Sequence, residues 1–156
     1  MMKNPSNAGK KDENGLRTSD DTIYKVLDYL YKQTNYKIKK VTILNLFTMV
    51  NGNPAYLKEY IGTPDELKFR KLNDDVFKNE LSNFNMNKDI IIAGWGDYNP
   101  LLESAYKQRI REVITLIGDK LIYRVGPTVN KNKYPGHGKL WYDYEELFLY
   151  PSDAVR

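Results

Sequence analysis

Apolar side chains recur along this chain with two spacings, one typical of amphipathic helices and the other typical of buried strands. Helical spacing predicts helices over residues 20–34, 54–60, 64–81 and 102–118. Short β-rich apolar runs predict strands over residues 41–48, 89–94 and 120–125. Residues 1–20 are expected to be mostly loop, residues 126–138 a long loop, and residues 141–150 a closing helix or strand on an edge.

The predicted helices carry recognisable ends and inner faces. Thr18 or Ser19 is expected to cap the first helix, and Gly118 is expected to end the last one. Pro54 is expected to open the short second helix. The predicted inner face of the third helix consists of Phe69, Leu72, Val76, Phe77 and Leu81.

Strands that alternate with helices predict an α/β fold, with an open parallel sheet covered by helices on both faces. A single domain over residues 1–156 is expected, because no repeat and no linker divides the chain. Ligands of such sheets bind beyond the carboxyl ends of the strands. The candidate site regions are therefore residues 45–51, 95–99 and 126–138.

Composition excludes several classes of chemistry. The chain has no cysteine and one histidine, which excludes disulfides and leaves no ligand set for zinc, so no metal or cofactor is predicted. The P-loop, the dinucleotide-binding glycine motif and the serine elbow are absent. No apolar run approaches the roughly 20 residues of a membrane span, and no signal peptide is recognised, so a cytoplasmic protein is expected.

The distribution of charge indicates a polyanionic partner. The net charge is +4, and residues 120–142 contain five cations and no acid, interleaved with tyrosine and tryptophan. Cations beside stackable rings suit phosphates and exposed bases, so a nucleotide or nucleic acid is the expected partner. The alternative is a solvated loop in a lysine-rich protein.

Three residues at the predicted strand ends are candidates for a ligand site. A neutral His137 could donate a hydrogen bond to a developing anion, although a solvent-exposed loop histidine is equally compatible with its setting. Trp95 is either a cap on the core or a stacking surface. Asn45 interrupts an apolar run, where its amide could read a base edge or bond neighbouring backbone.

Several motifs occur in an order that resembles a known family. They are Asn4-Pro5-Ser6, Asp21-Thr22, VTILNLF, AGWG and YPGHG. Together they resemble the family called domain of unknown function 1643, over nearly the whole chain. More distantly, they are similar to the uracil-DNA glycosylase superfamily, which implies a three-layer α/β/α fold with a short, mainly parallel four-stranded sheet.

The more distant resemblance implies a role for each matching residue. Asn4 would position water and His137 would stabilise a leaving base. The base would be held by residues of the other motifs, namely Pro5, Ser6, Asn45, Phe47 and Trp95. Phosphates would be held by Lys131, Lys133 and Lys139.

The sequence departs from the glycosylase pattern at three places. Gly138 follows His137 where proline is usual, and Asn4 is a poor general base. Only three residues precede Asn4, where a buried strand is expected, which predicts a short first strand or a start codon further upstream.

Three functions follow from these patterns. The first is a nucleotide- or nucleic-acid-binding module with a glycosylase-like pocket. The second is a hydrolase that cleaves the N-glycosidic bond to a nucleobase. The third is another small-molecule enzyme or a protein-interaction module that shares the fold.

Overall fold

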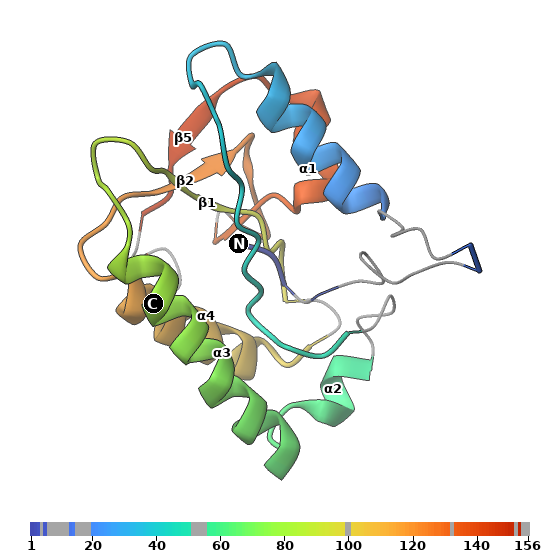
Figure 1. Ribbon diagram of the computed structural model, residues 1–156. Coiled ribbons are helices and arrows are strands. Elements are labelled where there is room, and N and C mark those ends of the chain that lie inside the picture. Colours follow the sequence, from blue (N-terminus) through green and yellow to red (C-terminus); the bar gives the residue numbers. More distant parts are fainter. Residues whose placement is uncertain are drawn as a thin grey trace.

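The computed structural model describes residues 1–3, 5, 13–14, 20–50, 56–98, 101–131, 133–151 and 153. The helices are α1 (Asp21–Lys32), α2 (Leu57–Tyr60), α3 (Pro64–Ser82), α4 (Glu103–Ile117) and the 3-10 helix η2 (Gly138–Asp143). The strands are β1 (Ile91–Ala93), β2 (Ile122–Val125), β3 (Thr128–Val129), β4 (Tyr134–Pro135) and β5 (Leu147–Leu149). The predicted mixture of helices and strands is confirmed (Figure 1).

The main sheet is small and mixed. β1 pairs with β2 in parallel, with Ile91 opposite Ile122. β5 pairs with the other side of β2 in the antiparallel direction, with Tyr123 opposite Leu149. The described residues therefore form a sheet of order β1-β2-β5, and the expected four-stranded parallel sheet is not found.

A short extended segment, Met1–Lys3, continues this arrangement beyond β1. The Gly94 amide donates to the Met1 carbonyl at 2.8 Å, and the Leu46 amide donates to the Met2 carbonyl at 2.8 Å. A parallel bridge links Met2 with Asn45. The strand predicted over residues 41–48 is thus reduced to one bridge, because Met1–Lys3 supplies partners only to residues 44–47.

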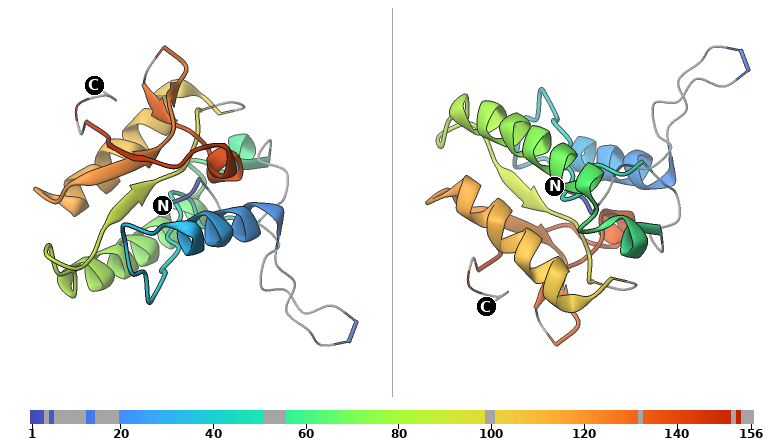
Figure 2. Two further views of the ribbon diagram at one scale, coloured as in Figure 1. Left: turned by 90° about the horizontal axis from the view of Figure 1, so that it is seen from above. Right: turned by 90° about the horizontal axis from the view of Figure 1, so that it is seen from below.

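Helices cover the two faces of the sheet. α3 and α4 pack on one face, where Ile91 and Ala93 of β1 join their apolar cluster. α1 and η2 pack on the other face, around Trp141, and the side chain of Ile92 lies against them. Figures 1 and 2 show the sheet between these two helical layers.

α4 supplies much of the core, as its sequence predicts. The side chains of Tyr106, Ile110, Val113 and Ile117 are fully buried. Each contributes roughly 1.5–3 kcal/mol through the removal of apolar surface from water. This stripe fixes α4 against β1 and β2.

The predicted inner face of α3 is wrong at three of its positions. Phe69, Leu72 and Val76 are 44%, 54% and 49% exposed, whereas Phe77 is fully buried. The reason is that charged side chains mediate the contact between α3 and α4.

Arg109 of α4 lies at the centre of this charged contact. It is fully buried. Its guanidinium donates to Asp74 at 2.7 Å, to Glu112 at 3.2 Å and to the carbonyl of Leu46 at 2.7 Å. A buried charge is tolerated only with partners of this kind.

Two local expectations also need correction, and a third falls outside the described residues. Asp20, rather than Thr18 or Ser19, caps α1, because its carboxylate accepts from the Ile23 amide at 2.7 Å. α2 begins at Leu57, and Pro54 lies outside the described residues. The loop predicted over residues 126–138 contains the antiparallel pair β3 and β4.

Candidate functional site

Three segments that are distant in the sequence end close together at the carboxyl ends of the parallel strands. They are Met1–Lys3, the stretch after β1, and residues 134–138. The Gly138 amide donates to the Gly94 carbonyl at 3.1 Å, which fastens the His137 region to the end of β1. Gly96 has a φ of 71°, and a Cβ there would lie 3.2 Å from the Cβ of His137. A glycine is required at this position both for its backbone angle and for the close approach of the histidine.

His137 is half-buried, and its protonation follows from its surroundings. Burial lowers its pKa below the usual 6.5, and the charges of Lys3 and Lys139 lower it further. Asp20 and Asp97 oppose this shift but do not cancel it. The imidazole is therefore neutral at neutral pH.

The tautomer of His137 is assigned from its hydrogen bond. The Lys139 amide donates to Nδ1 at 3.2 Å, so Nδ1 is the acceptor nitrogen of the neutral ring. Nε2 then carries the proton. The ring consequently offers an N–H donor, the group that a bound anion or carbonyl oxygen needs.

Lys3 places a cation in the same region. It is 8% exposed, and its ammonium lies 5.3 Å from the centre of the Tyr106 ring. Burial lowers its pKa, and the charge of Asp97 opposes this effect. The face of the Tyr106 ring and the carboxylate of Asp97 partly offset the charge of Lys3. The ammonium can still attract an anion.

Aromatic side chains form the base of the site. The Phe47 ring stacks on Tyr106, with ring centres 6.3 Å apart. The Tyr106 hydroxyl donates to the carbonyls of Trp95 at 3.0 Å and Gly96 at 3.1 Å. Burial raises the pKa of Tyr106 well above its usual value, so this hydroxyl stays protonated. Tyr106 thus links the backbone after β1 to Lys3.

The predicted base-contacting residues lie in different places. Phe47 belongs to the aromatic base, and Pro5 is half-buried. Trp95 is fully buried and packs edge-on against Tyr150 at 5.8 Å, so neither ring face is open to a ligand. Asn4 and Ser6 lie outside the described residues.

Asn45 contacts α3 through its backbone. Its main-chain carbonyl accepts from the Asn73 side chain at 2.9 Å, and its backbone bridges Met2. The residue is half-buried. No hydrogen bond among the described residues links Asn45 with His137.

The three predicted phosphate-binding lysines do not form one cluster. Lys139 pairs with Asp21 at 3.6 Å, and Lys133 pairs with Glu103 at 3.4 Å. Lys131 is exposed in the turn between β3 and β4. Exposed pairs of this kind contribute roughly 0–1 kcal/mol, so a phosphate could replace either carboxylate.

Sequence reasoning missed Lys3, Asp97 and Tyr106. Lys3 and Asp97 directly flank predicted motifs, since Lys3 precedes Asn4-Pro5 and Asp97 follows Trp95-Gly96. Tyr106 lies within the helix predicted over residues 102–118, outside the candidate site regions. Lys3 and Asp97 could have been identified from the sequence as polar residues at the ends of motifs.

The structure also bears on metal sites and on membrane-spanning helices. Within the described ranges, no group of three histidine, cysteine or acidic side chains lies together as metal ligands would. No helix in the same ranges is long and apolar enough to cross a membrane.

Comparison with known proteins identifies a family but no characterised relative. The family described as "Protein of unknown function (DUF1643)" matches residues 1–138. This range includes Lys3, Asp97 and His137. No curated protein and no solved structure matches the chain. The likeness to uracil-DNA glycosylases therefore gains no support from these comparisons.

Proposed function

The chain belongs to the DUF1643 family, and we propose that this member is a nucleotide- or nucleic-acid-binding module. Its ligand would lie at the carboxyl ends of the parallel strands, against Lys3, Asp97 and His137. One observation carries the proposal. A buried cation and the N–H of a neutral imidazole lie together there, although they come from opposite ends of the chain.

The chemistry of this pair favours an anionic, hydrogen-bonding ligand. Lys3 supplies charge in surroundings of low dielectric constant, where attraction to a phosphate is stronger than in water. His137 supplies a directional donor for a phosphate or a base carbonyl. Lys139 adds an exposed cation two residues from His137.

Not every predicted residue enters the proposed site. Asn4 and Ser6 keep their proposed roles without a structural test. Trp95 is omitted because its ring is enclosed by the core. Asn45 also keeps its proposed role without a structural test, because its described contacts are made by its backbone.

Binding to a labelled single-stranded DNA oligonucleotide, measured by fluorescence anisotropy, tests the proposal. Affinity should fall between about 50 and 200 mM salt, because bound phosphates release counterions. Lys3→Met should weaken binding roughly tenfold, since it removes a charge-assisted contact but keeps the length of the side chain. Lys71→Met is the matched control, because Lys71 is exposed on α3.

Two results would count against this function. One is binding that ignores salt. The other is an equal loss of affinity in the Lys3 and Lys71 variants, which would indicate a general charge effect rather than a site. Competition by uridine monophosphate would distinguish a nucleotide pocket from an extended nucleic-acid surface.

A second candidate function is hydrolysis of an N-glycosidic bond. The observation that favours it is the charge of Asp97 acting on the donor His137. In this reaction the oxygen of a water would bond to the sugar C1′ while the C1′–N bond breaks, His137 would stabilise the departing base anion, and the proton lost by the water would end on that base. Duplexes with uracil or other altered bases, treated with protein and then alkali, should show strand scission. Intact strands on every substrate, together with salt-sensitive binding, would leave the binding module as the function.

A further inference from the structure

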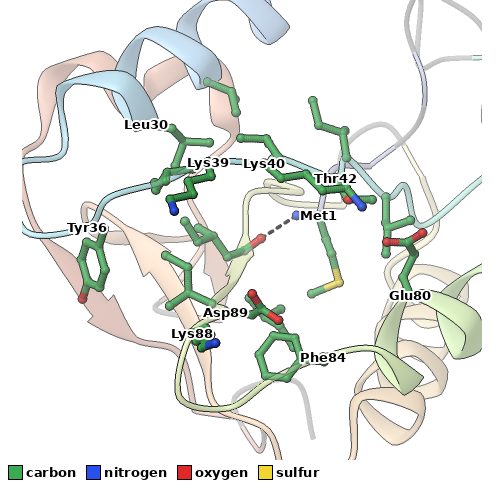
Figure 3. A pocket seen from close by; sticks show the side chains of 18 of the residues that line it. Met1, Leu30, Tyr36, Lys39, Lys40, Thr42, Glu80, Phe84, Lys88 and Asp89 are labelled. Carbon is green, nitrogen blue, oxygen red and sulfur yellow. Dashed lines mark hydrogen bonds between the residues drawn. The ribbon is translucent and has the colours of Figure 1, made fainter.

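A cavity opens at the opposite end of the strands from His137. Its volume is about 790 Å³, within the range of roughly 300–1,000 Å³ typical of small-molecule sites. Residues 35–44 form one wall, and α1, the end of α3 and residues 83–92 form the others. Figure 3 shows this space between the strap of residues 35–44 and the start of β1.

The interior of the cavity is largely aliphatic. Its lining includes Leu30, Ile43, Leu44, Leu81 and Ile91. Such a surface suits a hydrocarbon chain, since burial of each CH₂ group contributes about 0.8 kcal/mol. Uncharged polar residues also line the cavity, among them Asn35, Thr42 and Asn83.

The rim of the cavity is cationic. Lys37, Lys39, Lys40 and Lys88 line it and are exposed, and none of the four forms an ion pair within the described part of the chain. Figure 3 shows Lys39 and Lys88 approaching the space from opposite sides.

Two carboxylates also line the cavity, Glu80 and Asp89. Asp89 is engaged in its own turn, where it accepts from the Asn85 amide at 2.8 Å. Four cations against two acids leave a net positive rim. A ligand with one anionic head would therefore complement the charge here.

Trp141 forms part of the cavity wall. It lines the cavity and is almost fully buried, and its indole Nε1 has no hydrogen-bond acceptor among the described residues. Its ring adds to the apolar surface of the wall.

The strap that closes the cavity is weakly tethered. The backbone of residues 39–43 forms no hydrogen bond to the rest of the described chain. Residues 39–43 can therefore shift without breaking a backbone hydrogen bond to the described chain, whereas Leu44 stays bonded to the Met2 amide.

We propose that this cavity binds a single-chain amphipathic anion of the fatty-acid type. The hydrocarbon chain lies among the aliphatic side chains, and the carboxylate lies at the rim formed by Lys37, Lys39, Lys40 and Lys88. This site is independent of the one at the carboxyl ends of the strands.

The two tryptophans allow the position of the ligand to be read directly. Trp141 lines the cavity, whereas Trp95 does not. The Trp95→Phe protein keeps only Trp141, and the Trp141→Phe protein keeps only Trp95. A bromine-labelled dodecanoate, which quenches indole fluorescence on contact, should strongly quench the first protein and have little effect on the second.

Charge variants test the rim. Lys37→Ala, Lys39→Ala and Lys40→Ala combined should weaken dodecanoate binding roughly tenfold, because charge-assisted contacts are lost. Binding of uncharged dodecanol should change less than about twofold, since its burial is apolar. The control replaces the exposed Lys58, Lys68 and Lys71 with alanine, which removes the same charge elsewhere.

Four outcomes would overturn the proposal. Three of them are equal quenching of both single-tryptophan proteins, dodecanoate affinity unchanged by the rim variant, and an equal loss in the control. Quenching only by brominated lipid in phosphatidylserine vesicles, with none by free dodecanoate, would also overturn it and indicate a membrane surface instead.

Discussion

Two cations are buried in the described part of the chain, and their surroundings differ. Arg109 lies between α3 and α4, where two carboxylates and the carbonyl of Leu46 accept its hydrogen bonds. Lys3 lies at the carboxyl ends of the strands, where it meets the face of Tyr106 and the charge of Asp97 beside a neutral histidine. The first arrangement joins secondary-structure elements, and the second belongs to the site that we propose for a ligand.

The largest expected effect is on the Arg109 region. Arg109→Met should lower the free energy of unfolding by about 3 kcal/mol, because it leaves Asp74 and the Leu46 carbonyl without their donor. Asp74 is a quarter exposed, so water offsets part of the loss. Urea unfolding measures the change. A loss below about 1 kcal/mol would show that the network does not join the helices.

Gly96→Ala should have the next largest effect, about 1–2 kcal/mol of destabilisation. The alanine would adopt an unfavourable φ and would crowd His137. Gly118→Ala is the matched control, because its φ is 70° and nothing lies within 4 Å of the added Cβ. The difference between the two variants in thermal unfolding isolates the contact with His137, and equal losses would contradict that contact.

Lys3→Met should change the free energy of unfolding by less than about 1 kcal/mol in either direction. Burial already disfavours the charged form of Lys3, so removal of the charge should lower the free energy of unfolding only slightly, in contrast to Arg109. Urea unfolding of both variants under one condition gives the comparison. A destabilisation of Lys3→Met as large as that of Arg109→Met would mean that both cations are structural.

The smallest expected effect is on the titration of His137. It is the only histidine, so its imidazole protons are resolved by NMR, and the titration midpoint should lie below 6.5. Lys139→Ala should raise the pKa of His137, because the charge of Lys139 lowers it. An unchanged midpoint would show that the charge of Lys139 does not act on His137.

The lowered pKa of His137 also predicts a pH dependence of stability. The unfolded chain binds the proton more tightly than the folded one, so stability rises with pH through this interval. The contribution is fully present above about pH 6.5 and is lost as the pH falls toward the folded pKa. His137→Gln should flatten the dependence in urea unfolding between pH 5 and 7, and an unchanged slope would assign it to other groups.

Local periodicity was enough to predict much of the fold. The stripe of α4 and the apolar runs of β1 and β2 mark these elements clearly. The run over residues 41–48 carries the same signal, yet it forms only a bridge, because a strand also depends on a neighbour elsewhere in the chain. Similarly, no local pattern shows that α3 meets α4 through Arg109.

The candidate site was predicted in part. The strand-end rule placed His137 and the end of β1 together, and the Gly138–Gly94 hydrogen bond supports that placement. The same rule grouped Asn45 with them, and the described hydrogen bond of Asn45 joins its backbone carbonyl to Asn73 of α3. Spacing along the chain does not show which way the Asn45 side chain points.

The central claim is that Lys3 and His137 together hold an anionic nucleotide, and the NMR signal of His137 tests it most directly. Titration with uridine monophosphate should shift the imidazole resonances in a saturable manner. The shift should disappear in Lys3→Met and persist in Lys71→Met. A ligand that binds while the His137 resonances stay unmoved, or that moves them equally in both variants, would contradict the claim.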